Sequence, residues 1–150
     1  MSTLKEQLYR LCGEYISKRE ADIKRVIAEA REAANNETKS SAGDKYETGR
    51  ELMQQEIDLN RTRINELNKL KQVLERISPA HKSETAQPGS LVYTSIGNYY
   101  IAIGAGQLNV DGCNYYAISA ASPIGLKLMT LKTGSSFLLN GKTVEIINVD

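Results

Sequence analysis

The sequence predicts an α+β protein, in which a long antiparallel pair of helices forms a coiled coil and precedes a small antiparallel sheet with one helix. Residues 1–87 hold 16 of the 19 Lys and Arg residues and 15 of the 18 Asp and Glu residues. This part has no proline before Pro79, whereas the rest of the chain is rich in Gly, Tyr, Val and Ile. Helices are therefore expected first and strands after them.

Two segments have the three- and four-residue spacing of apolar side chains that is typical of amphipathic helices. The apolar positions of the first are Leu4, Leu8, Leu11, Tyr15, Ile16, Ile23, Ile27 and Ala30, and those of the second are Leu52, Met53, Ile57, Ile64, Leu67, Leu70, Leu74 and Ile77. The polar segment 35–45 between them contains a glycine and is predicted to be a turn.

An antiparallel pairing of these helices brings their apolar positions into register. When Leu4 is placed against Ile77, the two residue numbers of each apolar pair add up to between 80 and 82 along both helices. With helices of roughly 33 residues, the arm would be on the order of 50 Å long. We therefore predict that residues 1–80 form a helical hairpin with its tip near 36–47.

The second half has the composition of a linker and then of a sheet. Residues 81–89 are predicted to be the linker, and residues 90–150 the second domain. Strands are expected at 90–96, 98–104 and 115–121, and a helix at 123–132 is expected to be capped by Ser122 with Pro123 in its first turn. Asn140-Gly141 between two apolar runs predicts a hairpin with a two-residue turn.

Composition excludes several functional classes. The net charge of +1 predicts no independent binding to DNA and no attraction to a membrane. One histidine and two distant cysteines, Cys12 and Cys113, predict neither a zinc site nor a disulfide framework. The first ten residues have no apolar core of a signal peptide, so we expect a cytoplasmic protein.

The predicted tip carries the segment Gly43-Asp44-Lys45-Tyr46-Glu47. Asp44 and Glu47 are three residues apart at a predicted helix start, so their side chains would project in similar directions. The same pattern is also that of a helix cap with an acidic first turn, and the two roles do not exclude each other. Cationic residues surround the acids, and they either meet a charged partner or belong to a solvated mixed-charge end: Lys39, Lys45 and Arg50.

Two motifs and the domain order resemble the Gre family of bacterial transcript cleavage factors. Residues 43–47 look like the G-D-x-x-E of the family's hairpin tip, whose Asp and Glu are the functional acids. Residues 122–129, Ser-Pro-Ile-Gly-Leu-Lys-Leu-Met, with Gly134 and the closing hairpin, look like the family's S-P helix and the strands that follow it. The resemblance covers the full length and implies an FKBP-like second domain.

The resemblance implies a transcription elongation factor that is not an enzyme by itself. Its hairpin would enter the secondary channel of bacterial RNA polymerase and stimulate cleavage of a backtracked transcript. Asp44 and Glu47 would be the catalytic acids, holding a second Mg²⁺ jointly with the polymerase, because carboxylates are the hard oxygen ligands that Mg²⁺ prefers. Tyr46 and the three cations are candidate contact residues for the polymerase or RNA, and the 3′ end of the nascent RNA is expected as an indirect partner.

The tip also departs from the family pattern. After the Glu, family members usually continue with Asn, a small residue, Glu and Tyr, whereas this chain has Thr48, Gly49, Arg50 and Glu51. This favours an alternative, a channel regulator or inhibitor of the polymerase that lacks cleavage activity. Two further classes remain: a peptidyl-prolyl isomerase, which one Phe and no Trp disfavour, and a coiled-coil adaptor with no polymerase contact.

Overall fold

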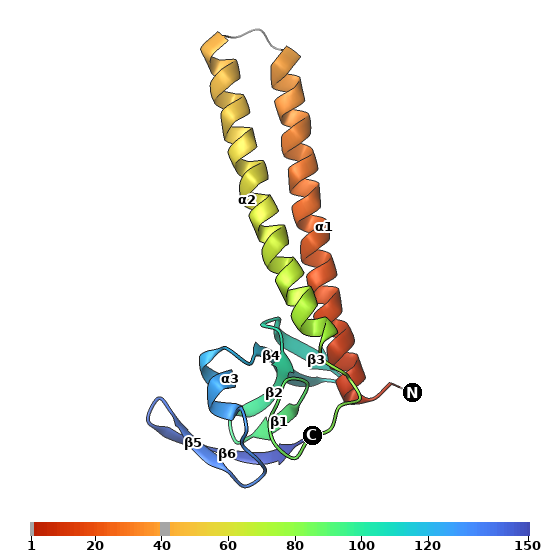
Figure 1. Cartoon of the computed structure of the whole chain (residues 1–150), viewed down its shortest axis with the longest axis vertical. Coiled ribbons are helices and arrows are strands. Elements are labelled where there is room, and N and C mark those ends of the chain that lie inside the picture. Colours follow the sequence, from red (N-terminus) through yellow and green to blue (C-terminus); the bar gives the residue numbers. More distant parts are fainter. Residues whose placement is uncertain (1, 40–42) are drawn as a thin grey trace. The chain divides into compact units, whose positions relative to one another are not determined.

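The computed structural model describes residues 2–39 and 43–150, with side chains described for residues 2–36 and 49–150. It is an α+β fold with a long N-terminal helical region, a six-stranded mixed sheet and a short helix (Figure 1). The elements are α1 (Leu4–Lys39), α2 (Gly43–Glu75), β1 (Leu91–Thr94), β2 (Gly97–Ala102), β3 (Gly106–Val110), β4 (Cys113–Ser119), α3 (Pro123–Leu128), β5 (Ser136–Leu139) and β6 (Lys142–Val149).

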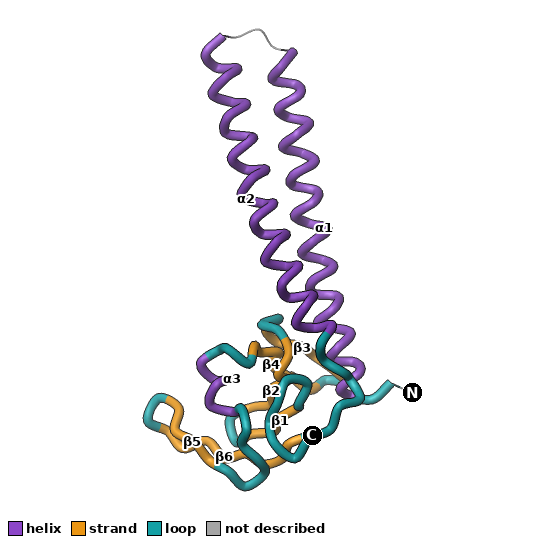
Figure 2. The backbone as a smooth tube through the Cα atoms, viewed as in Figure 1, coloured by secondary structure: helices purple, strands orange, loops and turns teal. Residues whose placement is uncertain are grey.

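The chain divides into two compact units. The sheet unit consists of Met1–Tyr15 and Lys71–Asp150, and it holds all six strands with the first part of α1 and the last part of α2. In its described residues, the arm unit, Ile16–Leu70, contains only parts of α1 and α2, the two long purple helices of Figure 2. Each unit has its own hydrophobic core.

The core of the arm unit is a small cluster that joins α1 to α2. Ile27, Ala30 and Ile57 are buried, and the half-buried side chains of Ile23, Met53 and Ile64 pack against them. All six lie at positions that the apolar spacing selects, because those positions recur on one side of each helix. The later part of α1 therefore packs against the first half of α2.

The predicted turn at 35–45 is too long. Helix α1 continues through Lys39 and α2 begins at Gly43, so residues 35–39 and 43–45 are helical. Polar composition misled the prediction, because Asn, Glu, Thr and Lys side chains on a solvent-exposed helix need no apolar neighbour.

The sheet has the strand order β3-β4-β2-β1-β6-β5. Strand β1 pairs antiparallel with both β2 and β6, and β5–β6 and β3–β4 are antiparallel hairpins. Strand β2, however, pairs in parallel with β4, with Tyr99 beside Tyr116 and Ile101 beside Ile118. The prediction of a purely antiparallel sheet was therefore wrong.

The parallel pair follows from a strand that the sequence analysis missed. Strand β3 runs back from β2 along the outer side of β4, and β4 then returns in the direction of β2. The β3–β4 turn is Asp111-Gly112, whose φ angles of 51° and 80° are those of a tight two-residue hairpin turn. The Asp-Gly pair was a readable signal for this hairpin.

The other predicted hairpin is confirmed. Strands β5 and β6 are joined by Asn140-Gly141, with φ angles of 51° and 80°. A right-handed twist of the strands favours this turn type, and Asn and Gly tolerate its positive φ at low cost.

Both faces of the sheet bear buried side chains. On one face, Val92, Ile101, Ile146 and Leu128 of α3 form a core with Ala86. Tyr100 alternates with Ile101 along β2 and is fully buried on the other face, near Cys12 of α1. The start of α1 and helix α3 therefore contribute to the burial of opposite faces.

Helix α3 begins as predicted and ends earlier, at Leu128 instead of residue 132. The Ser122 hydroxyl accepts a hydrogen bond from the Gly125 amide at 3.0 Å, and Pro123 occupies the first turn. A Cβ at Gly125 would lie 2.1 Å from the Ser119 carbonyl oxygen, so only glycine allows the helix to start this close to β4.

The segment before β1 is hydrogen bonded into the sheet unit. The Ala86 amide donates to the Leu131 carbonyl at 2.7 Å, and the Thr130 amide donates to the Ala86 carbonyl at 2.8 Å. The Gly89 amide donates to the Ile101 carbonyl at 2.7 Å. The segment that its composition predicts to be a linker thus covers one end of the sheet-unit core.

Candidate functional site

The residues predicted at the tip lie at the ends of the two long helices. Lys39 is the last residue of α1, and Asp44, Lys45, Tyr46 and Glu47 lie in the first two turns of α2. Their side chains fall outside the residues whose side chains the structure describes. The helix start that the sequence predicts next to Asp44 is therefore present, and the roles of these side chains remain predictions.

Arg50 is the predicted contact residue whose side chain is described, and it lines a groove between α1 and α2. The groove has a volume of about 240 Å³. Arg31 and Asn35 of α1 and Arg50, Gln54, Ile57 and Arg61 of α2 contribute to its lining. Three guanidinium groups from two helices therefore surround one space.

Sequence reasoning did not find Arg31 and Arg61. A signal for Arg31 was available, because the pairing register of the apolar residues also places Arg31 opposite Arg50. The predicted register uses apolar positions only. A like-charged pair facing across two helices is unusual, since it costs Coulomb energy unless something of opposite charge is near.

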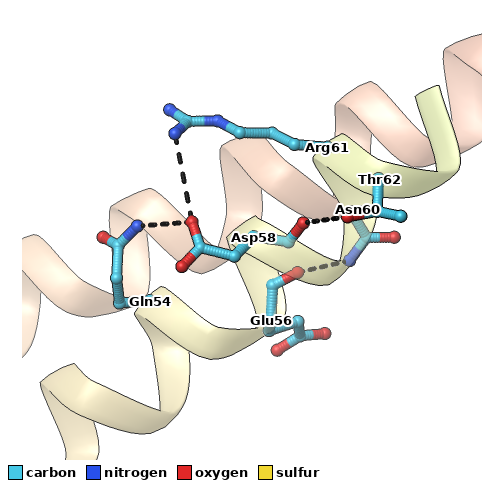
Figure 3. Close-up of polar contacts among 6 residues, drawn as sticks. All are labelled: Gln54, Glu56, Asp58, Asn60, Arg61 and Thr62. Carbon is cyan, nitrogen blue, oxygen red and sulfur yellow. Dashed lines mark hydrogen bonds and ion pairs between the residues drawn. The ribbon is translucent and has the colours of Figure 1, made fainter. Parts of the chain in front are cut away.

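A network of polar contacts along α2 borders this groove (Figure 3). Asp58 Oδ1 accepts a hydrogen bond from Gln54 Nε2 at 3.0 Å and lies 4.0 Å from Arg61 Nη1. The Asp58 and Arg61 side chains are 62% and 55% exposed, so solvent screens their attraction. Asp58 therefore holds two of the groove's polar side chains only weakly.

Asn60 is a buried polar residue on the same helix, with 2% of its surface exposed. Its Nδ2 donates to the Glu56 carbonyl at 2.9 Å, and its Oδ1 accepts from Arg63 Nη1 at 3.2 Å. Both partners lie on α2 itself, so these bonds satisfy the buried amide within its own helix, whatever the register of α1 against α2.

The sheet unit has a second cavity, of about 230 Å³, beside the buried Lys5. Lys5 Nζ donates to the main-chain oxygens of His81 and of Asp150, the latter at 3.0 Å. Removal of the ammonium group from water lowers the pKa of Lys5, and the charge of Asp150 opposes this shift. These contacts tie the start of α1 to two later segments, which is a structural role.

Cys12 is buried where α1 meets the sheet. Burial raises the pKa of its thiol to about 12, and a hydrogen bond from the Ile103 amide partly opposes the shift. Burial likewise raises the pKa of Tyr100, whose hydroxyl has no hydrogen-bond partner within the described residues. A neutral buried thiol is a poor nucleophile, so this pair does not form a catalytic site.

Among the residues whose side chains the structure describes, 2–36 and 49–150, no group of three or more His, Cys, Asp or Glu side chains is placed to hold a metal ion. As far as the chain is described, no helix has an apolar stretch long enough to cross a membrane.

Comparison with known proteins leaves the function to be argued from the molecule itself. No protein-family model matches the chain, and a search of curated proteins found no match.

Proposed function

We propose that the chain is a Gre-like transcription elongation factor whose two long helices form an antiparallel coiled-coil hairpin that enters the secondary channel of RNA polymerase. The observation that carries the proposal is the position of Asp44 and Glu47. Helix α1 ends at Lys39 and α2 begins at Gly43, so both acids lie in the first two turns of α2, shortly after the end of α1 in the chain. That is the end of the arm unit that lies away from Ile16 and Leu70.

The sheet unit supports the same proposal. We assign it to an FKBP-like domain that docks at the rim of the channel. Ser122 caps a short helix with Pro123 in its first turn, and Gly134 and the β5–β6 hairpin follow, in the order that the resemblance implies. The Gly125 contact with the Ser119 carbonyl makes this helix start specific to glycine, because a side chain there would overlap the main chain.

The chemistry of the tip fits a metal ion held jointly with the polymerase. Two carboxylates are hard oxygen donors, which Mg²⁺ prefers, but they are too few to fill its octahedral shell. Asp44 and Glu47 would hold the ion at the polymerase active site, and the polymerase would supply the remaining ligands. When bound, the ion would help to stabilise the attacking and leaving oxygens of phosphodiester hydrolysis.

A second candidate is a channel regulator that slows the polymerase without cleaving RNA. The observation that favours it is Arg50, which follows the tip acids where the family pattern differs. Arg50 lines a groove with Arg31 instead of standing alone at the tip. For a channel regulator of this kind, the charged end of the arm would occupy the channel, and Asp44 and Glu47 would serve as helix-capping residues.

The deciding experiment uses stalled, backtracked elongation complexes of the cognate polymerase. Cleavage of the RNA 3′ end is followed against Mg²⁺ concentration with the wild-type chain and with Asp44→Asn/Glu47→Gln. The control is Glu56→Gln, which removes an exposed carboxylate farther along α2. Polymerase binding is measured in parallel by co-sedimentation.

Each outcome has one meaning. We expect cleavage by the wild type and by Glu56→Gln, and a loss of at least a hundredfold in the double variant, with binding retained. Binding that slows synthesis without cleavage would replace the first proposal by the second. An absence of any binding would refute both.

A further inference from the structure

The groove between α1 and α2 gathers three arginines. Several cations of the two helices lie beside acids, as in Lys24–Glu20 at 2.8 Å and Lys69–Glu66 at 3.1 Å, and Arg61 of the groove lies 4.0 Å from Asp58. Arg31, by contrast, forms no ion pair with any residue whose side chain is described. Among the side chains that the structure describes, the lining of the groove contains three arginines and no carboxylate.

Guanidinium groups bind phosphate oxygens through two parallel N–H donors, which makes arginine the preferred side chain for this anion. The exposed amides of Asn35 and Gln54 add neutral donors to the same lining. Ile57, 4% exposed, supplies an apolar wall that limits competing water on one side. We infer that this groove is a binding site for the di- or triphosphate group of a small anion.

The size of the groove restricts the ligand further. Its volume of about 240 Å³ lies below the roughly 300–1,000 Å³ that is usual for enclosing a whole organic ligand. The groove therefore takes the phosphate chain, and any attached nucleoside lies in solvent. Inorganic pyrophosphate and a nucleoside triphosphate should bind with similar affinity.

Asp58 is one group that competes with such a ligand. Its Oδ1 accepts from Gln54 and lies near Arg61, so two lining side chains are turned partly toward this carboxylate (Figure 3). Replacement of Asp58 by asparagine removes the competing charge and retains an acceptor oxygen. The site thus has a variant that should bind more tightly, which an unfolded protein could not do.

The test is calorimetric titration of the full chain with inorganic pyrophosphate at low salt. We expect Arg31→Ala/Arg50→Ala to weaken binding at least tenfold and Asp58→Asn to strengthen it about threefold. Arg31→Lys retains the charge and should still weaken binding severalfold, because it loses the two-donor geometry. The matched control is Arg25→Ala on the same helix, outside the groove and 3.9 Å from Asp22, and it should change the affinity less than twofold.

Three further ligands show which class of phosphate compound the groove binds. ATP should bind as pyrophosphate does, and inorganic monophosphate should bind at least fivefold more weakly, because it spans fewer guanidinium groups. A short RNA with a 5′-hydroxyl end tests phosphodiesters. The inference is overturned if pyrophosphate fails to bind, if the RNA alone binds through the groove, or if Arg25→Ala weakens binding as much as the groove variants do.

This inference does not depend on the proposed role at the polymerase, because binding is measured on the free chain. Circular dichroism of each variant checks that its helix content is retained. Arg to Ala changes on an exposed helix surface are not expected to lower it, since alanine has the higher helix propensity.

Discussion

The sheet unit and the arm unit bury their apolar residues in different ways. In the sheet unit, Val92, Ile101 and Leu128 are fully buried between a sheet and a helix. In the arm unit, Ile27 and Ile57 keep 7% and 4% of their surface exposed, because two helices alone leave the edges of their seam open to water. We therefore expect the arm to have the lower local stability.

The largest expected effect is in the core of the sheet unit, which is the better packed of the two units. Leu128→Ala should lower the free energy of unfolding by about 3 kcal/mol, because a cavity forms in a core that cannot collapse around it. Leu126→Ala is the control, since Leu126 lies on the same helix and is 67% exposed. Denaturant unfolding followed by circular dichroism measures both, and equal effects would contradict the assignment of the core face of α3.

A smaller and more local effect is expected in the arm. Ile57→Ala should cost about 2 kcal/mol of local stability, since the open seam can partly close around the smaller side chain. Amide hydrogen exchange should show the loss in α1 and α2 of the arm unit, while β1 and β2 keep their protection. Leu59→Ala, at a position that is 52% exposed, should leave exchange unchanged. Equal loss of protection in the strands would show that the two units unfold together.

The smallest expected effect is a pH dependence of the free energy of unfolding, caused by the buried Cys12 of the sheet unit. The pKa of Cys12 is raised to about 12 in the folded chain, from an ordinary value of 9.0 for an exposed thiol. Above pH 9 the unfolded thiol loses its proton first, so stability falls as pH rises toward the folded pKa. The wild type should lose about 1 kcal/mol more than Cys12→Ala between pH 8 and pH 10.

Denaturant unfolding at the two pH values measures this difference. A thiol reagent at pH 8 provides the matching observation, because the exposed Cys113 should react quickly and Cys12 only after unfolding. A similar slope for wild type and variant would mean that the Cys12 thiol does not titrate as its burial requires.

Local signals predicted those parts of the fold that depend on a few neighbouring residues. The apolar spacing selected Ile23, Ile27, Met53 and Ile57, which share one cluster, because helical geometry repeats whatever surrounds it. Asn140-Gly141 and Ser122-Pro123 predicted a turn and a helix start, because those residues satisfy backbone requirements locally. The Asp111-Gly112 turn was equally readable and was overlooked.

The direction in which β4 pairs with β2 follows from the presence of β3, a strand that was not predicted. Without β3, the third strand was expected to return antiparallel to β2, whereas with β3 in place it runs parallel. One missed strand inverts the direction of every later strand in a meander. Strand order and direction are therefore sensitive to the count of elements, whereas a helix position is not.

The features of the candidate sites also differ in whether chain order or tertiary packing determines them. The sequence by itself determined that carboxylates lie where one long helix ends and the next begins, and which apolar positions form the arm's core, because both follow from chain order and helical period. Only the tertiary structure decided that Arg31, Arg50 and Arg61 share a groove, that Gly125 must be glycine and that Lys5 is buried against two main-chain oxygens. The groove and the Lys5 contacts join different segments of the chain, and the Gly125 contact depends on how closely α3 starts to the end of β4. Packing sets each of these approaches, which local preference alone does not.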